Sequence, residues 1–280
     1  MRRMLLLIRR LGWDARIIAF LLALLLLAGL LEPWLPPADY KAPASGPRRN
    51  APGAEFLFGT DSLGRSVLAR TIEGVRLTFV VSATAVTLAG IVGSVMGMAA
   101  AYTRGLLDPL IAAVTNVMFA FPAIIFGLLV TAILGPGTTS AIAAIFFVVL
   151  PTMIRVSRSA TMTVMERDFV IAAEISGASP WRILRVHIAP NIAAITVVQL
   201  AYMLSIGMIV ESALSYLGLG VQPPTSSLGT LLRENSAFIV AAPWMVLAPG
   251  AVLAVLIFSV NYLGDYARGL LDPVEPRALA

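Results

Sequence analysis

The sequence predicts an all-α polytopic membrane protein that crosses a bilayer with six helices. Hydrophobic residues make up 59% of the 280-residue chain and charged residues only 12%, about half the charged share of a typical soluble domain. Apolar stretches without charge recur along the whole chain, as expected for repeated membrane spans. Of the 20 Lys and Arg residues, thirteen fall on alternate connecting segments, which is the bias that cytoplasmic loops carry. Six spans with this bias place both termini in the cytoplasm.

The first predicted span follows an arginine-rich start. Five arginines lie between Arg2 and Arg16, and residues 17–31 form an unbroken apolar run whose flank reaches toward Leu35. A positive start before an apolar run is also typical of a secretory signal peptide, and Ala42-Pro43-Ala44 is a candidate cleavage site. Because the run approaches the roughly 20 residues needed to cross a bilayer, we interpret it as an uncleaved anchor helix.

Five further spans are predicted at 77–102, 110–134, 140–154, 192–217 and 244–263. Arg104 and Asp108 mark a short inner turn, and the Gly-Pro-Gly sequence from Gly135 begins an outer turn. Residues 223–243 are expected to form an outer loop, and Trp244 is expected to anchor the last span at the membrane interface.

Glycines and prolines inside the spans indicate where helices pack closely or kink. Gly93 and Gly97 form a G-x-x-x-G pair that permits close helix packing. Pro122 and Pro151 are expected to kink their helices. Kinked helices can line a moving pore, so both prolines are candidates for a pore or a packing role.

Residues 59–66 mimic a phosphate-binding loop, with Arg65 in place of the usual lysine. No strand precedes the glycines and Asp61 would repel a phosphate, so we reject a nucleotide site. We expect instead an amphipathic helix from Asp61 or Ser62 to Arg76 that lies at the outer membrane surface. Its apolar face is formed by Leu63, Val67, Leu68, Ile72 and Val75.

Composition excludes several classes of site. The chain has no cysteine and one histidine, His187, so a metal site or a Ser-His triad has almost no ligands or bases available. No cofactor is expected. The net charge of +5 and the pI near 10.1 could indicate nucleic acid, but the position of the arginines in short loops explains the charge and no nucleic-acid partner is predicted.

Residues 168–191 are the longest polar segment, and their pattern predicts two short helices joined by a turn. Phe169, Ala172, Ala173 and Ser176 are spaced to share one small, mildly apolar helical face. Gly177 lies where the first helix should end in a left-handed conformation. Ser179-Pro180 then offers an N-cap and a proline at the first helical position. A simple interfacial connection between two spans is the alternative.

The same segment resembles the EAA loop of ABC-importer permeases, which docks on an ATPase subunit. The resemblance rests on Ala172-Ala173, Gly177 and the sequence from His187 to Pro190. Two departures, Ile171 in place of the glutamate and Ala189 in place of a leucine, affect the detail of the docking surface. The resemblance implies an ATPase-coupling role for Asp168, Phe169, Ala172, Ala173, Gly177, Ala178, Trp181, Arg182 and Pro190.

Two other segments resemble the oligopeptide/dipeptide/nickel branch of these permeases, in its second-permease type. They are residues 58–66, and residues 211–220 with the Val-Gln-Pro-Pro sequence that follows. The resemblance implies the type I importer permease fold in a bacterial inner membrane. It divides the chain into an N-terminal anchor, external loop and interfacial helix at 1–76 and a transmembrane domain at 77–280, with its coupling loop at 165–190.

The resemblance also implies the function and the partners. The chain would form half of a translocation pore for dipeptides or oligopeptides, with nickel chelates or other small solutes as alternative cargo. A second permease subunit, two ATP-binding cassette subunits and an external solute-binding protein would complete the importer, and ATP would bind to the partner ATPases. This chain itself would not be an enzyme.

Glu211 is the one acidic residue well inside a predicted span. An intramembrane ionisable residue is a functional candidate, and the alternative is a glutamate that fixes helix packing near the outer rim. A secondary transporter driven by an ion gradient would be expected to show paired intramembrane charges or inverted repeats. Glu211 stands alone in its span, and no clear repeat is present, so the importer interpretation is favoured.

Overall fold

The computed structural model describes residues 12–32, 43–103 and 105–271, and these ranges are mostly helical. The one β-type pairing among them is an isolated antiparallel bridge between Thr60 and Ser66. The predictions for the arginines before residue 12, for the reach of the first span to Leu35 and for the final tail lie outside the described residues.

The long helices are α2 (Trp13–Leu31), α3 (Val67–Thr103), α4 (Leu107–Ala120), α5 (Ala123–Leu134), α6 (Thr138–Met165), α9 (Ala189–Tyr216) and α11 (Trp244–Leu271). Shorter elements are α7 (Asp168–Ile175), α8 (Pro180–Arg182), the π-helix η3 (Ile183–Ile188), α10 (Leu228–Asn235) and the 3₁₀ turn η4 (Ser236–Phe238). Among the described residues, five helices are long and apolar enough to cross a membrane, and the bent pair α4–α5 makes a sixth if it counts as one span.

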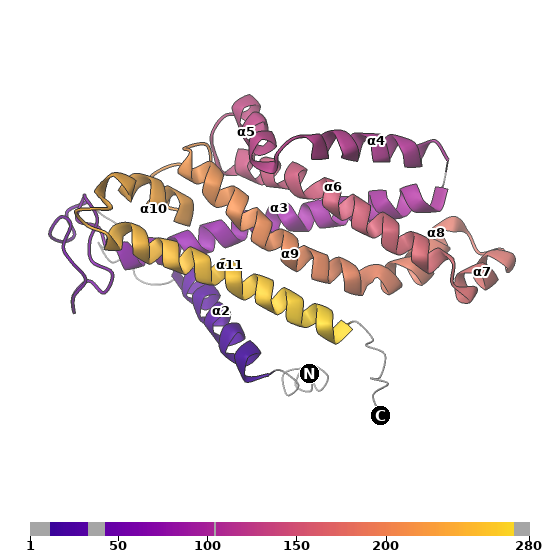
Figure 1. Ribbon diagram of the computed structural model, residues 1–280, viewed down its shortest axis with the longest axis horizontal. Coiled ribbons are helices and arrows are strands. Elements are labelled where there is room, and N and C mark those ends of the chain that lie inside the picture. Colours follow the sequence, from indigo (N-terminus) through magenta and orange to yellow (C-terminus); the bar gives the residue numbers. More distant parts are fainter. Residues whose placement is uncertain (1–11, 33–42, 104, 272–280) are drawn as a thin grey trace.

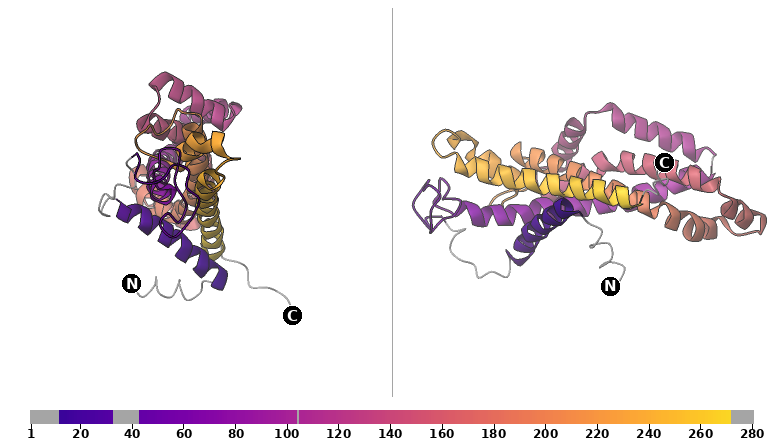
Figure 2. Two further views of the ribbon diagram at one scale, coloured as in Figure 1. Left: turned by 90° about the vertical axis from the view of Figure 1, so that its left-hand side faces the viewer. Right: turned by 60° about the horizontal axis from the view of Figure 1, so that its bottom comes forward.

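The helices form an elongated bundle whose two ends are formed by different elements (Figure 1). The α7–α8 segment projects from one end, while α10 and the loop before α3 cover the other. Helices α3, α6, α9 and α11 run along the bundle between these ends. Figure 2 shows α2 and the α4–α5 pair on opposite sides of it.

The α3 and α6 helices form the centre of the bundle because two glycines let their backbones approach. A Cβ atom at Gly97 would lie 2.5 Å from the Ile154 carbonyl oxygen and 2.8 Å from the Arg158 amide nitrogen. A Cβ atom at Gly93 would lie 2.6 Å from the Met153 Cβ. Without a hydrophobic driving force between helices in lipid, such contacts drive association. The G-x-x-x-G pair therefore serves packing within the chain, as predicted.

The predicted interfacial helix at 61–76 is wrong in its bounds and its environment. Helix α3 begins at Val67 and continues without a break to Thr103, so the proposed domain boundary at residue 76 falls inside one helix. Asp61 does not cap this helix. Its Oδ1 accepts hydrogen bonds from the amides of Leu63 and Arg65, 2.8 and 2.9 Å away, and closes a turn before the helix begins.

Buried ion pairs hold the outer end of α3, and the sequence pattern did not reveal them. The Arg70 side chain is only 3% exposed, and its guanidinium lies 3.0 Å from the Asp61 carboxylate and 2.9 Å from that of Glu234. Arg70 also donates to the Ser226 hydroxyl at 2.7 Å. Charged side chains can be buried when they are paired in this way, so Arg70 points into the protein and not toward a membrane surface.

The predicted outer loop at 223–243 contains a buried helix. Helix α10 begins with a capping box, in which the Ser227 hydroxyl accepts from the Thr230 amide and the Thr230 hydroxyl accepts from the Ser227 amide. Its residues Leu228 and Leu231 are buried against the bundle. The short amphipathic pattern was hidden between prolines and polar residues, which favoured the loop interpretation.

The third span is broken, as Pro122 led us to expect, but more sharply than a kink. Helices α4 and α5 meet at an angle of 96°. Phe121 is extended, the conformation that a residue before proline prefers, and Pro122 occupies the N-cap of α5. Pro151, in contrast, lies inside α6, which continues through it to Met165. Helix α6 is therefore longer than the predicted span, which ended at Ile154.

Two arginines on the extended part of α6 hold α4 in place. The Arg158 guanidinium makes two hydrogen bonds to the Asp108 carboxylate, at 2.5 and 2.7 Å. Arg155 donates to the Asn116 side chain at 3.2 Å and lies over the Phe119 ring at 4.2 Å from its centroid. Polar contacts of Asp108 and Asn116 thus fix α4, the first part of the broken span, to α6.

Glu211 joins three helices near the end of the bundle that lies opposite the α7–α8 segment. Its side chain is fully buried, and its carboxylate accepts hydrogen bonds from the Thr78 hydroxyl of α3 at 2.8 Å and from Ser215, one turn along α9, at 2.7 Å. The Thr78 hydroxyl in turn accepts from the Leu228 amide at the start of α10, 3.1 Å away. A Cβ atom on Gly229 would lie 2.3 Å from the Ser212 carbonyl oxygen, so α9 and α10 are in close contact here. This geometry favours the packing interpretation of Glu211.

We predict that Glu211→Gln keeps most transport, because the amide preserves the shape of the side chain and its oxygen can still accept one of the two hydrogen bonds, while its NH2 group can donate to the other hydroxyl. Glu211→Leu should instead leave both hydroxyl hydrogens without an acceptor in a buried site, at a cost of about 1–3 kcal/mol each. The thermal unfolding midpoint of the purified protein in detergent should therefore fall for Leu and change little for Gln. A Gln variant with an unchanged unfolding midpoint and no transport would contradict the packing role.

Candidate functional site

The coupling segment, residues 165–190, begins with a helix that packs by one edge onto the end of the bundle. In α7, Val170 is fully buried and packs with Ile183, Ile188 and Ile192. Ala173 lies partly buried against the same cluster. The remaining sides of α7 are exposed. One edge of the helix therefore packs on the bundle, and its other sides are accessible to a partner.

Exposed apolar side chains cover the open side of the coupling segment. Ile175 is 83% exposed and Trp181 is 69% exposed, and Phe169 and Ile171 are about half as exposed as Ile175. Exposed apolar side chains in this number are typical of an interaction surface. The predicted face of Phe169, Ala172, Ala173 and Ser176 is only part of it. Ile171 and Ile175 were missed, although their i, i+4 spacing was a signal for them.

The end of α7 is a Schellman motif built on Gly177. The Ala178 amide donates to the Ala173 carbonyl and the Gly177 amide to the Glu174 carbonyl, both at 3.0 Å. Gly177 has a φ of +76°, the left-handed conformation that glycine adopts without strain. The motif also brings Ala178 against the cluster that holds Ala173. The predicted left-handed helix end at Gly177 is confirmed.

The chain then restarts as a helix at Ser179, as predicted. The Ser179 hydroxyl accepts from the Arg182 amide at 3.4 Å, and Pro180 occupies the first helical position. The sequence predicted a separate second short helix, and that is wrong. The α8, η3 and α9 elements form one helical path from Pro180 to Tyr216.

A π-helical turn permits this continuity. Pro190 has no amide hydrogen, so an α-helical hydrogen bond is missing at this position. In η3 the ladder shifts register, and the Ala189 amide donates to the Leu184 carbonyl, five residues back. Insertion of one residue into the turn carries the helix through the proline. The coupling segment is therefore an extension of the fifth span.

Charged residues of both signs surround the apolar surface. Asp168 and Glu174 lie on α7, while Arg182 and Arg185 lie on the helix that follows, and all four are exposed. His187 lies between the two parts, with its ring centroid 6.3 Å from that of Phe169. Across the described residues, no cluster of three or more potential ligands could hold a metal ion.

The other predicted candidates do not meet the coupling segment. Glu211 lies near the opposite end of α9, and Pro122 lies at the break between α4 and α5 on one side of the bundle (Figure 1). Pro151 is buried within α6. The structure thus separates the exposed apolar segment at one end from Glu211 and Pro151, which are buried elsewhere.

Known proteins similar to this chain include several transport permeases. A di/tripeptide transport system permease of Pseudomonas aeruginosa is 35% identical over 89% of this chain and 84% of its own length. A dipeptide transport system permease of Alkalihalophilus pseudofirmus is 36% identical over 89% and 82%. A glutathione transport system permease of Escherichia coli is 32% identical over 91% and 84%.

Solved structures and a family model agree with the fold. A chain of the inward-facing MetNI methionine ABC transporter superimposes with a TM-score of 0.59 and 19% identity, covering 73% of this chain and 96% of that one. The model of the family described as "binding-protein-dependent transport system inner membrane component" matches residues 89–273, which include the coupling segment, the broken span and Glu211. The chain is a member of this family of ABC-importer permease subunits.

Proposed function

We propose that this chain forms half of the translocation pore of an ATP-driven importer for short peptides, and that residues 165–190 couple the pore to the ATPases. The observation that carries the proposal is the continuous helix from Pro180 to Tyr216, which joins an exposed apolar docking segment to a membrane span. The peptide cargo is supported by the di/tripeptide and dipeptide permeases to which the chain is similar. Nickel chelates or other small solutes are alternative cargo.

The proposed importer contains a second permease subunit, two ATP-binding cassette subunits and an external solute-binding protein. ATP is bound and hydrolysed by the cassette subunits, and the chain contributes no catalytic group of its own. Closure of the ATPase pair moves α7, and α9 carries that motion into the membrane. The exposed side chains of Ile175 and Trp181 provide the apolar contact through which the motion is transferred.

The proposed orientation places both termini and the coupling segment in the cytoplasm of a bacterial inner-membrane protein. The distribution of arginines between the spans supports it. Reporter fusions test it directly. A fusion after Ala280 should be active on the cytoplasmic side, and a fusion at Thr138, where α6 begins, on the external side. A cytoplasmic signal from the Thr138 fusion would refute this orientation.

We predict that Gly177→Val uncouples ATP hydrolysis from transport. Valine has no space problem here, since no atom lies within 4 Å of a Cβ at this position. Its backbone conformation is unfavourable, however, because a residue with a Cβ atom costs about 1–2 kcal/mol in the left-handed region. That cost lowers the population of the native turn by a factor of roughly 5 to 30. Substrate-stimulated ATP hydrolysis by the purified importer should fall by a similar factor.

Gly177→Asn is the matched control, because asparagine tolerates the left-handed conformation. It should retain most of the stimulated ATP hydrolysis. Both variants should still insert and purify with their ATPases, since the spans do not depend on this turn. Normal transport by the Val variant would show that this turn does not couple the pore to the ATPases.

A further inference from the structure

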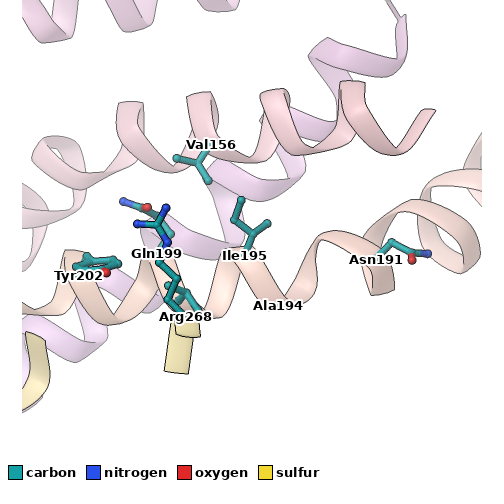
Figure 3. A pocket seen from close by; sticks show the side chains of 8 residues that line it. Val156, Asn191, Ala194, Ile195, Gln199, Tyr202 and Arg268 are labelled. Carbon is teal, nitrogen blue, oxygen red and sulfur yellow. The ribbon is translucent and has the colours of Figure 1, made fainter. Parts of the chain in front are cut away.

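A groove with polar walls lies along the inner half of α9 (Figure 3). It has a volume of about 400 Å³ and is bounded by α6 through Val156 and by α11 through Arg268. The floor is one face of α9, formed by Asn191, Ala194, Ile195, Val198, Gln199 and Tyr202. In Figure 3 the side chains of Gln199 and Arg268 overlap in the view, and Asn191 lies apart from them along α9, at the end that follows the coupling segment.

The polar groups of the groove are available to a ligand. The Gln199 carboxamide makes no hydrogen bond within the described part of the chain. The Asn191 side chain donates to the His187 carbonyl at 2.6 Å, which leaves its amide oxygen free to accept. The Tyr202 hydroxyl donates to the Asp265 carboxylate and also interacts with Arg268. Arg268 itself is exposed and lies at the edge of the groove.

Such a surface is unsuited to contact with lipid. Polar and ionisable side chains on a membrane span are costly in hydrocarbon and therefore face protein or a water-filled cavity. Here they share a concave surface, and they offer an amide, a guanidinium and, at its margin, the carboxylate of Asp265. A short peptide presents complementary groups: backbone amides, a terminal carboxylate and a terminal ammonium.

We propose that this groove binds the peptide cargo in the inner half of the pathway, with Arg268 taking the terminal carboxylate and Gln199 and Asn191 the backbone amides. The inference rests on the proposed import of peptides. Arginine suits a carboxylate because its planar fork can donate two parallel hydrogen bonds. Asp265 lies one turn before Arg268 on α11 and provides the opposite charge for the ammonium end.

The absence of cysteine from the chain allows a direct test. Ala194→Cys places a thiol on the groove floor, and Val197→Cys places one on an exposed face of α9 outside the groove. In the assembled, nucleotide-free importer, a charged methanethiosulfonate reagent should modify Cys at 194 at least about tenfold faster than at 197, because thiol modification needs water and thiolate.

The ligand is then tested with alanyl-alanine and with its C-terminal amide. Alanyl-alanine should slow modification at 194 with increasing concentration, and the amide should do so less. In the Arg268→Gln variant, alanyl-alanine and its C-terminal amide should slow modification at 194 equally. Gln199→Leu serves as a second variant if Arg268→Gln fails to assemble, and it should weaken protection by both peptides.

Two results would overturn the proposal. Absence of modification at 194 in the assembled importer would mean that protein or lipid covers the groove. Modification that neither peptide slows would mean that the groove holds water, or a lipid headgroup on Arg268, but no peptide. Uptake of alanyl-alanine by the same importer is measured in parallel. ATP-driven uptake without protection would refute the groove site alone, whereas loss of uptake in the unmodified importer would refute the peptide function.

Discussion

The unbroken helical path from Pro180 to Tyr216 is the constraint on which the rest of the structure depends. Trp181 lies at its first turn, and the turn at Gly177 and the exposed Ile175 come just before it in the chain. The half of the path that follows the π turn forms the floor of the polar groove, and the half that ends at Tyr216 carries Glu211. Because a helix bends little over this length unless a proline, a π turn or an inserted group intervenes, a displacement at one end reaches the other. The π turn at Ile183–Ile188, with Pro190 directly after it, is the place on this path where a hinge would form.

The Tyr216 end of α9 is held by polar contacts, while the Pro180 end of the helical path is held by apolar ones. Thr78, Glu211 and the Leu228 amide tie α3, α9 and α10 together. Beside them, Arg70 joins Asp61 to Glu234 across segments far apart in the chain. Removing one partner of such a buried group is strongly destabilising because the other is left unpaired. At the inner end, by contrast, α7 rests on a small cluster around Val170 and Ile183. Because of this asymmetry, the coupling segment is less tightly held than the end of α9 that carries Glu211.

The features that could be predicted from the sequence are those determined locally. Membrane spans follow from uncharged length, the left-handed turn follows from Gly177, and the restart follows from Ser179-Pro180. Contacts distant in the chain could not be predicted. Arg70 lies in the segment that was predicted to form a surface helix, and only its contacts with Asp61, Glu234 and Ser226 explain its burial. The buried helix α10 was likewise hidden, because Leu228 and Leu231 have an apolar neighbourhood only once α3 and α9 have packed.

Within the coupling segment, sequence predicted the turn more accurately than the surface. The resemblance to the EAA loop directed attention to the small residues Ala172 and Ala173, whereas the structure exposes the larger Ile171 and Ile175. The sequence predicted a second short helix within residues 168–191, separate from the span at 192–217, and proline, here Pro190, usually interrupts the helical ladder. The shift to π geometry before it removed that break. A helix boundary predicted from proline alone therefore depends on whether the preceding turn can change its register.

Whether α9 transmits motion as one body can be measured by pulsed electron paramagnetic resonance. Spin labels on Arg182→Cys and Ile209→Cys, both exposed positions, flank the π turn and lie about 40 Å apart at 1.5 Å per residue. In the assembled importer, one narrow distance that is the same with and without ATP is the result expected for a rigid connection. A distance that shifts or broadens when ATP binds would show that the π turn is a hinge, and would contradict coupling through a rigid α9.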